Sequence, residues 1–119
     1  MGEEAILNST VFEITDEATW RQKGDDAPGK VFVEFFVTWC PHCQREAPIL
    51  DGIADSLEAD GIGVYRANAE VMYTKGDEYG LTETPSFIFL EDGQLKGKHE
   101  GFLDAEQLSR FAHTGRVEG

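Results

Sequence analysis

The residues with the clearest chemistry in this sequence are two cysteines separated by two residues. They stand in Trp39-Cys40-Pro41-His42-Cys43, and the 119-residue chain has no other cysteine. An apolar segment (residues 31–37) precedes the motif and a helix-like pattern follows it. Cys40 is therefore expected at a helix N-terminus, where free backbone N–H groups and the helix dipole stabilise a thiolate. Cys43 follows one helical turn later, so the two sulfur atoms can form a disulfide and exchange two electrons and two protons.

The pattern around the cysteines alternates between strands and helices. Strands are expected at residues 10–14, 30–37, 62–67, 86–90 and 95–101, and helices at 16–23, 43–60, 72–79 and from 104 onward. Crossover helices make the first three strands parallel, and an Asp-Gly turn at residues 92–93 makes the last two an antiparallel hairpin. The order β-α-β-α-β-α-β-β-α is typical of an α/β fold, and the length suits one domain.

Two residues interrupt the expected elements. Pro48 lies within the long helix, where it removes one backbone hydrogen bond and is expected to kink the helix. Glu34 stands between Val33 and Phe35 in a strand that is otherwise apolar, which indicates burial on both faces of a sheet. Burial raises the pKa of a carboxyl group, so Glu34 is a candidate for proton transfer. Alternatively, its side chain reaches solvent or pairs with a cation such as Lys30.

The composition favours an acidic globular domain and argues against several kinds of partner. Ten Lys and Arg residues stand against 23 Asp and Glu residues, which gives a net charge of −13 and a pI near 4.4. Such a surface repels phosphate groups and anionic lipids, so neither nucleic acid nor a membrane is an expected partner. No long apolar run is present, and the N-terminus is acidic where a signal peptide is basic. A cytoplasmic protein is expected, although a trimmed export signal would leave the same sequence.

Further residues stand at characteristic intervals around the cysteine motif. They are Glu34, Trp39, Pro48, Tyr79-Gly80, Thr84-Pro85, Gly93 and Gly101. With the two cysteines, this combination resembles the thioredoxin family over residues 8–115, which leaves residues 1–7 as an N-terminal extension. The resemblance implies a thioredoxin fold, an α/β domain with a central mixed five-stranded sheet flanked by four helices.

The dipeptide Pro41-His42 departs from the usual family pattern. Typical thioredoxins carry Gly-Pro between the cysteines, whereas Pro-His resembles DsbA-type thiol oxidases and a subgroup of atypical thioredoxins from sulfate-reducing anaerobes. A chain of 119 residues leaves no room for the helical insertion of DsbA, so the body of the protein is similar to thioredoxin. We expect a reduction potential between those of thioredoxin and DsbA, which are about −270 and −120 mV.

The resemblance implies a role for each residue of the redox site. Cys40 is the nucleophile that attacks a client disulfide, and Cys43 then attacks Cys40 to release the reduced client. Glu34 relays a proton to and from Cys43. His42, which follows Pro41, tunes the redox couple if its imidazole favours the Cys40 thiolate. Alternatively, His42 is a solvated loop residue without effect.

The same resemblance implies a groove for the client beside Cys40. A cis peptide bond between Thr84 and Pro85 would face the cysteines and offer the Thr84 backbone to an extended client strand. Trp39 would cover the groove, unless it packs in the core, and Gly101 would let the client backbone approach closely.

These inferences together predict a monomeric protein-disulfide reductase of the thioredoxin type that acts on disulfide-containing client proteins. Its electrons would come from a flavin-dependent thioredoxin reductase, and neither a bound cofactor nor a metal is expected. Two alternatives remain: a thiol oxidase similar to DsbA, and a thioredoxin-like module that binds a metal or a partner without turnover. A closed metal site needs ligands besides the cysteines, and the histidines available are His42, His99 and His113.

Overall fold

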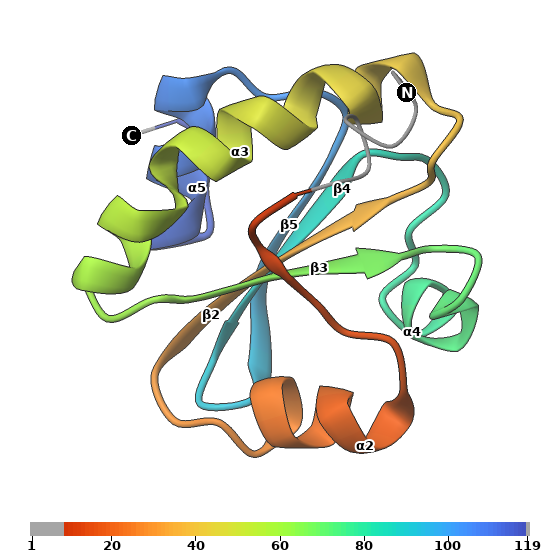
Figure 1. Cartoon of the computed structure of the whole chain (residues 1–119). Helices are drawn as coiled ribbons and strands as arrows, with labels where there is room; N and C mark the ends of the chain where they lie inside the picture. Colours follow the sequence, from red (N-terminus) through yellow and green to blue (C-terminus); the bar gives the residue numbers. More distant parts are fainter. Residues whose placement is uncertain (1–8, 119) are drawn as a thin grey trace.

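A mixed sheet of five strands forms the centre of the structure, with the strand order β1-β3-β2-β4-β5 (Figure 1). The computed structural model describes residues 9–118, so the predicted extension at residues 1–7 lies outside the described residues. β3 is parallel to β1 and β2, whereas β4 is antiparallel to β2 and β5, which confirms the predicted sheet. The strands are β1 (Phe12–Glu13), β2 (Lys30–Phe36), β3 (Gly63–Asn68), β4 (Ser86–Glu91) and β5 (Gln94–Glu100).

The first strand is shorter than the sequence predicts. The alternating pattern indicates a strand at residues 10–14, but β1 contains only two residues, at the edge of the sheet. Its side chains do not alternate between a buried and an exposed face, because Val11 and Ile14 are buried while Phe12 is 52% exposed. The apolar residues therefore mark the ends of a short edge segment and not one face of a strand.

Helices cover both faces of the sheet (Figure 1). Helix α2 (Glu17–Trp20) continues into a π-helical turn, η1 (Arg21–Asp25), and is followed by α3 (Pro41–Ala59), α4 (Tyr73–Glu78) and α5 (Ala105–Thr114). With α2 and η1 counted as one, these are the four predicted helices. Side chains cap two of these helices: Asp16 accepts the Thr19 N–H, and Asp104 forms a capping box with Gln107. Helix α3 continues past Pro48 as a single element.

Two hydrophobic cores lie on opposite faces of the sheet. On one face, α3 and α5 pack against the strands through side chains such as Leu50 and Phe111. On the other face, Trp20 of α2 and Met72, just before α4, pack against β2 and β4. Every residue of β2 after Lys30 is buried, so this strand is held from both sides. The rigid strand fixes the point at which the chain turns into α3, and that point carries the cysteines.

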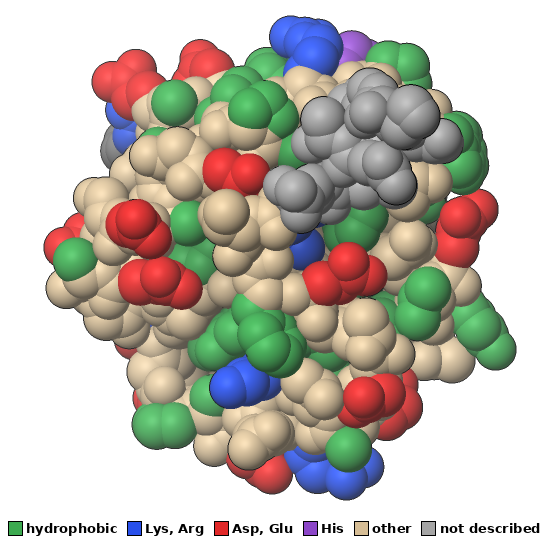
Figure 2. Space-filling view, viewed as in Figure 1, with side chains coloured by type: hydrophobic (Ala, Val, Ile, Leu, Met, Phe, Trp, Pro, Cys, Tyr) green, Lys and Arg blue, Asp and Glu red, His purple; other side chains and the backbone are tan. Residues whose placement is uncertain are grey.

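The surface is acidic, in keeping with the net charge of −13. On the face shown in Figure 2, Asp and Glu side chains are scattered among polar and hydrophobic ones and do not gather in a single patch. Within residues 9–118, each helix is either too short or too polar to cross a membrane.

Candidate active site

Cys40 is the N-cap residue of α3, as the sequence predicts. Its backbone is extended, and its Sγ accepts a hydrogen bond from the Cys43 N–H at 3.3 Å. Pro41 opens the helix, where the N–H that proline lacks would have no partner within the helix. Both cysteines are free thiols, and their side chains are 8% and 2% exposed. Cys40 is therefore largely buried, although it lies at the N-terminus of the helix.

The two thiols differ strongly in acidity. Burial raises the pKa of Cys40, but hydrogen bonds with Cys43, Thr84 and the His42 backbone outweigh it, so the pKa falls below its ordinary value. Burial raises the pKa of Cys43 to about 12, and its hydrogen bond with Cys40 acts in the same direction. The outer sulfur is thus the one that ionises first, and the inner sulfur keeps its proton.

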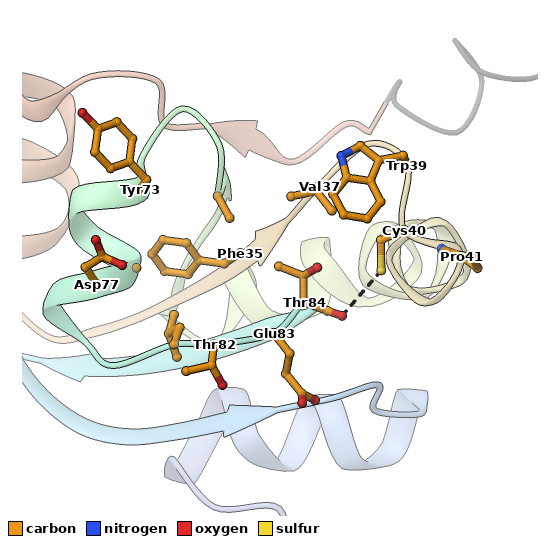
Figure 3. Close-up of a pocket in the computed structure, with 13 residues that line it drawn as sticks. Phe35, Val37, Trp39, Cys40, Pro41, Tyr73, Asp77, Thr82, Glu83 and Thr84 are labelled. Carbon is orange, nitrogen blue, oxygen red and sulfur yellow. Dashed lines mark hydrogen bonds between the residues drawn. The ribbon is translucent and has the colours of Figure 1, made fainter.

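The loop before β4 faces Cys40. The Thr84–Pro85 peptide bond is cis, as predicted. The Cys40 thiol donates a hydrogen bond to the Thr84 carbonyl oxygen at 3.5 Å (Figure 3). The Pro85 carbonyl oxygen accepts the Gly101 N–H at 2.8 Å, and Gly101 has a φ of 112°, a conformation that favours glycine. A continuous set of contacts therefore leads from Cys40 through the cis-proline loop to Gly101.

Trp39 lies on the surface beside Cys40 (Figure 3). Its side chain is 68% exposed, so the alternative of core packing is wrong. The indole N–H donates to the Glu70 carboxylate at 3.3 Å, which holds the ring next to the cysteine. An exposed indole of this size is typical of a surface that contacts a partner.

A cavity of about 440 Å³ opens beside the Cys40 sulfur (Figure 3). Its apolar lining includes Phe35, Val37 and Leu81, and the side chains of Asp77 and Glu83 are exposed beside it. Because β2, α4 and the loop before β4 each contribute residues, the cavity forms only in the folded chain.

Glu34 is fully buried and pairs with Arg66. The Arg66 Nε–H donates to Glu34 Oε1 at 3.1 Å, and the two residues lie opposite each other in neighbouring strands. Glu34 thus pairs with a cation, as one alternative predicts, but the cation is Arg66 and not Lys30, whose ammonium donates to the His113 carbonyl oxygen at 2.9 Å. Burial raises the pKa of Glu34 to about 7, although the Arg66 charge opposes this shift. The carboxyl group therefore changes charge near neutral pH.

A second buried acid, Glu46, is absent from the residues predicted for the site. It lies on α3 three residues after Cys43, and its side chain is 0% exposed. Its Oε1 accepts the Leu103 N–H at 2.8 Å. Burial raises the pKa of Glu46 to about 8, although the bond from Leu103 opposes this shift. The sequence signal was its position directly before Ala47, on the border of the buried helix face.

The imidazole of His42 contacts α3 and the loop after β5. Arg45 Nη1 lies 3.2 Å from His42 Nδ1, and since arginine only donates, this nitrogen is the acceptor. The Arg45 guanidinium also stacks on the Phe102 ring at 4.2 Å. The influence of His42 on Cys40 in this structure runs through its backbone, which forms a hydrogen bond with the sulfur.

The other two histidines have separate contacts. The His99 ring stacks on Phe87 with centroids 6.4 Å apart, and His113 Nε2 lies 2.8 Å from the Asp60 carboxylate. Across residues 9–118, no three His, Cys, Asp or Glu side chains converge in a group that could hold a metal ion.

The fold and the site together define an α/β domain with a dithiol at a helix N-cap that faces a cis-proline loop. The family model for thioredoxin matches residues 11–114, and the chain belongs to the thioredoxin family.

Two curated relatives of the chain are thioredoxins. The chain is 37% identical over 78 residues to "Thioredoxin Y2, chloroplastic" of Arabidopsis thaliana, an alignment that covers 66% of this chain and 46% of that protein. The match thus spans about half the length of this relative. The chain is also 27% identical over 105 residues to the thioredoxin of Pseudomonas aeruginosa, which covers 88% of this chain and 95% of that protein.

Solved structures agree on the fold. The thioredoxin of Malassezia sympodialis superposes with a TM-score of 0.75 at 25% identity, over 89% of this chain and 90% of that one. A mutant thioredoxin from Halobacterium salinarum gives a TM-score of 0.76 at 18% identity, over 86% and 87% of the two chains.

Proposed function

We propose that this chain is a protein thiol–disulfide oxidoreductase that reduces client disulfides through a Cys40–Cys43 dithiol. The observation that carries this proposal is the position of the Cys40 sulfur. It caps α3, accepts the Cys43 N–H and faces the Thr84 carbonyl oxygen. Membership of the thioredoxin family supports the same activity.

The reaction consists of two successive exchanges. The Cys40 thiolate attacks one sulfur of the client disulfide, forms a mixed disulfide, and expels the other client sulfur as a thiolate that takes up a proton. Cys43 then loses its proton and attacks the Cys40 sulfur. The products are the Cys40–Cys43 disulfide and a client dithiol, so two electrons have passed to the client. A reductant must supply two electrons to restore the dithiol.

Glu34 is the proposed proton relay for Cys43. Because the pKa of Cys43 is about 12, its attack needs a base that removes the proton near neutral pH. The pKa of Glu34, raised by burial to about 7 and opposed by Arg66, suits a group that accepts and returns a proton under these conditions. Arg66 stabilises the carboxylate form that the base requires.

Pro41 and His42 are proposed to set the strength of the redox couple. Pro41 presents a first helical turn with φ already suited to the helix. The backbone of His42 forms a hydrogen bond with the Cys40 sulfur and favours its thiolate. A more stable thiolate stabilises the reduced protein and makes the disulfide a stronger oxidant.

The client is proposed to bind as an extended segment across the cis-proline loop. The backbone of Thr84 and Pro85 would pair with it, while Trp39 and Gly101 would lie on either side. The cavity beside Cys40 supports an apolar client side chain near the reacting cysteine, and the exposed carboxylates of Asp77 and Glu83 favour clients with basic flanks.

The wider setting also forms part of the proposal. We infer a thioredoxin domain over residues 8–115 preceded by an extension at 1–7, a cytoplasmic monomer, and a flavin-dependent thioredoxin reductase as electron donor. The family match over residues 11–114 supports the domain limits. The charge of −13 supports the absence of nucleic-acid and membrane partners.

Reduction of insulin by the purified protein, with NADPH and a thioredoxin reductase, tests the activity. The wild type should turn over, Cys40→Ser should be inactive, and Cys43→Ser should accumulate a mixed disulfide with the client. If Cys43→Ser turned over and trapped nothing, the assignment of attacking and resolving cysteines would be wrong.

The same assay separates the alternatives. The Pro41-His42 pair favours the alternative of a thiol oxidase similar to DsbA. Oxidation of a reduced client without any reduction of insulin would support that alternative. Stoichiometric metal binding without turnover would instead support a binding module.

A further inference from the structure

Glu46 is a fully buried acid that the proposed reaction does not use. Its Oε1 accepts the Leu103 N–H at 2.8 Å, but its Oε2 is buried without a hydrogen-bond partner among the described residues. Glu34 has the Arg66 guanidinium beside it, whereas this backbone N–H is the one hydrogen-bond donor to Glu46 within residues 9–118. Burying a carboxyl oxygen without a hydrogen-bond partner lowers the stability of the folded protein. A buried group of this kind therefore calls for an explanation, such as a functional role.

The partner of Glu46 belongs to the segment that connects β5 to α5. In this segment, the Gly101 N–H bonds to the Pro85 carbonyl oxygen at 2.8 Å. Phe102 lies under the Arg45 guanidinium, 4.2 Å from the ring centroid, and Leu103 bonds to Glu46. Two consecutive residues of α3 therefore hold Phe102 and Leu103, which directly follow Gly101, the residue proposed to lie beside the client.

The charges around Glu46 favour its neutral form. Glu34 faces it from β2 and Asp104 from the start of α5, and both carboxylates oppose its ionisation. Arg45, on the same helix, acts in the opposite direction but is exposed to solvent. Burial outweighs the favourable contributions and raises the pKa of Glu46 to about 8. Once ionised, the carboxylate gains hydration only if the Leu103 segment moves away from it.

We propose that Glu46 is a positioning residue: in its neutral form it holds the Gly101–Leu103 segment on α3 and so fixes Gly101 beside the client, and its ionisation releases that segment. The position of Gly101 beside a client rests on the proposed function. The contact between Glu46 and Leu103 does not, so the two ideas can be tested separately.

Kinetics with a client disulfide test the positioning role. Glu46→Gln keeps an oxygen acceptor for Leu103 without the charge, whereas Glu46→Leu removes the acceptor. Near neutral pH, Glu46→Gln should keep the wild-type KM, while Glu46→Leu should raise KM by about fivefold, the usual effect of one lost hydrogen bond, with kcat little changed. The KM of the wild type should rise above about pH 8, and that of Glu46→Gln should not. Glu58→Gln, which removes a charge from an exposed position of α3, is the matched control and should behave as the wild type.

A spectroscopic titration tests the contact without any turnover. The NMR shift and hydrogen exchange of the Leu103 amide should change with a midpoint near pH 8 in the wild type and in Glu58→Gln, but not in Glu46→Gln. An unchanged KM in Glu46→Leu, or the same Leu103 titration in Glu46→Gln, overturns the proposal. If the wild type reduces no client but its Leu103 amide titrates as stated, the proposed function fails while the ionisation-linked hold of Glu46 on Leu103 stands.

Discussion

Replacing Glu34 by Gln should flatten the dependence of the free energy of unfolding on pH. Burial raises the pKa of this carboxyl from 4.5 to about 7 in the folded protein. The folded state therefore keeps a proton that the unfolded state has already lost, so the stability from this group is complete below about pH 4.5 and is lost as pH rises through 7. The interval is about 2.5 pH units, and one unit corresponds to about 1.4 kcal/mol, so the loss amounts to about 3 kcal/mol.

Urea unfolding of the reduced protein, followed by tryptophan fluorescence from about pH 4.5 to pH 8.5, measures this loss. Glu34→Gln also leaves the Arg66 guanidinium without its charged partner. Because the resulting loss of stability is nearly independent of pH, the comparison uses the slopes of the stability curves against pH and not their absolute values. Arg66→Met should have the opposite effect, because the pKa of Glu34 rises further without the guanidinium and the loss becomes larger. Glu58→Gln is the control. Parallel curves for the wild type and Glu34→Gln would refute the reasoning.

Three further substitutions test the surroundings of the cysteines. Gly101→Val should destabilise the fold by about 1 to 3 kcal/mol, because a β-branched residue is strained at a φ of 112°. It should also raise the KM for insulin. Urea unfolding measures the first effect and steady-state kinetics the second. Trp39→Ala should change stability by less than about 0.5 kcal/mol because the indole is 68% exposed, yet should weaken client binding in the same kinetic assay. His42→Pro, which removes the backbone N–H that bonds to the Cys40 sulfur, should lower the reduction potential, measured against glutathione, by up to about 30 mV, a tenfold change in the equilibrium constant. An unchanged or higher potential would remove His42 from the tuning of the couple.

Local patterns were sufficient to predict most of the fold. The helical pattern that follows the cysteines and the Asp-Gly turn between β4 and β5 both involve residues close in sequence. Residues 92 and 93 both have positive φ, as that turn requires. The prediction failed at β1, where Phe12 faces solvent, because edge pairing with β3 and not apolar alternation sets the limits of that strand.

The site depended more on contacts between distant segments. Lys30 lies four residues from Glu34 along one strand, too far for an ion pair, whereas Arg66 lies directly opposite Glu34 because of the register between β2 and β3. That register is not evident from the sequence. Glu46 was missed for a similar reason, since its hydrogen bond comes from Leu103, which is 57 residues away in the chain.

The ionisation of Cys40 is the most direct test of this account. Thiolate absorbance near 240 nm, recorded against pH for the wild type and for Cys40→Ser, reports each thiol in turn. The structure predicts a first thiolate with a pKa below that of an ordinary cysteine, which disappears in Cys40→Ser, and a second that ionises only near pH 12. A Cys40 thiol that titrates like a free cysteine, or two thiols that titrate together, would contradict the claim that the N-cap of α3 activates this sulfur.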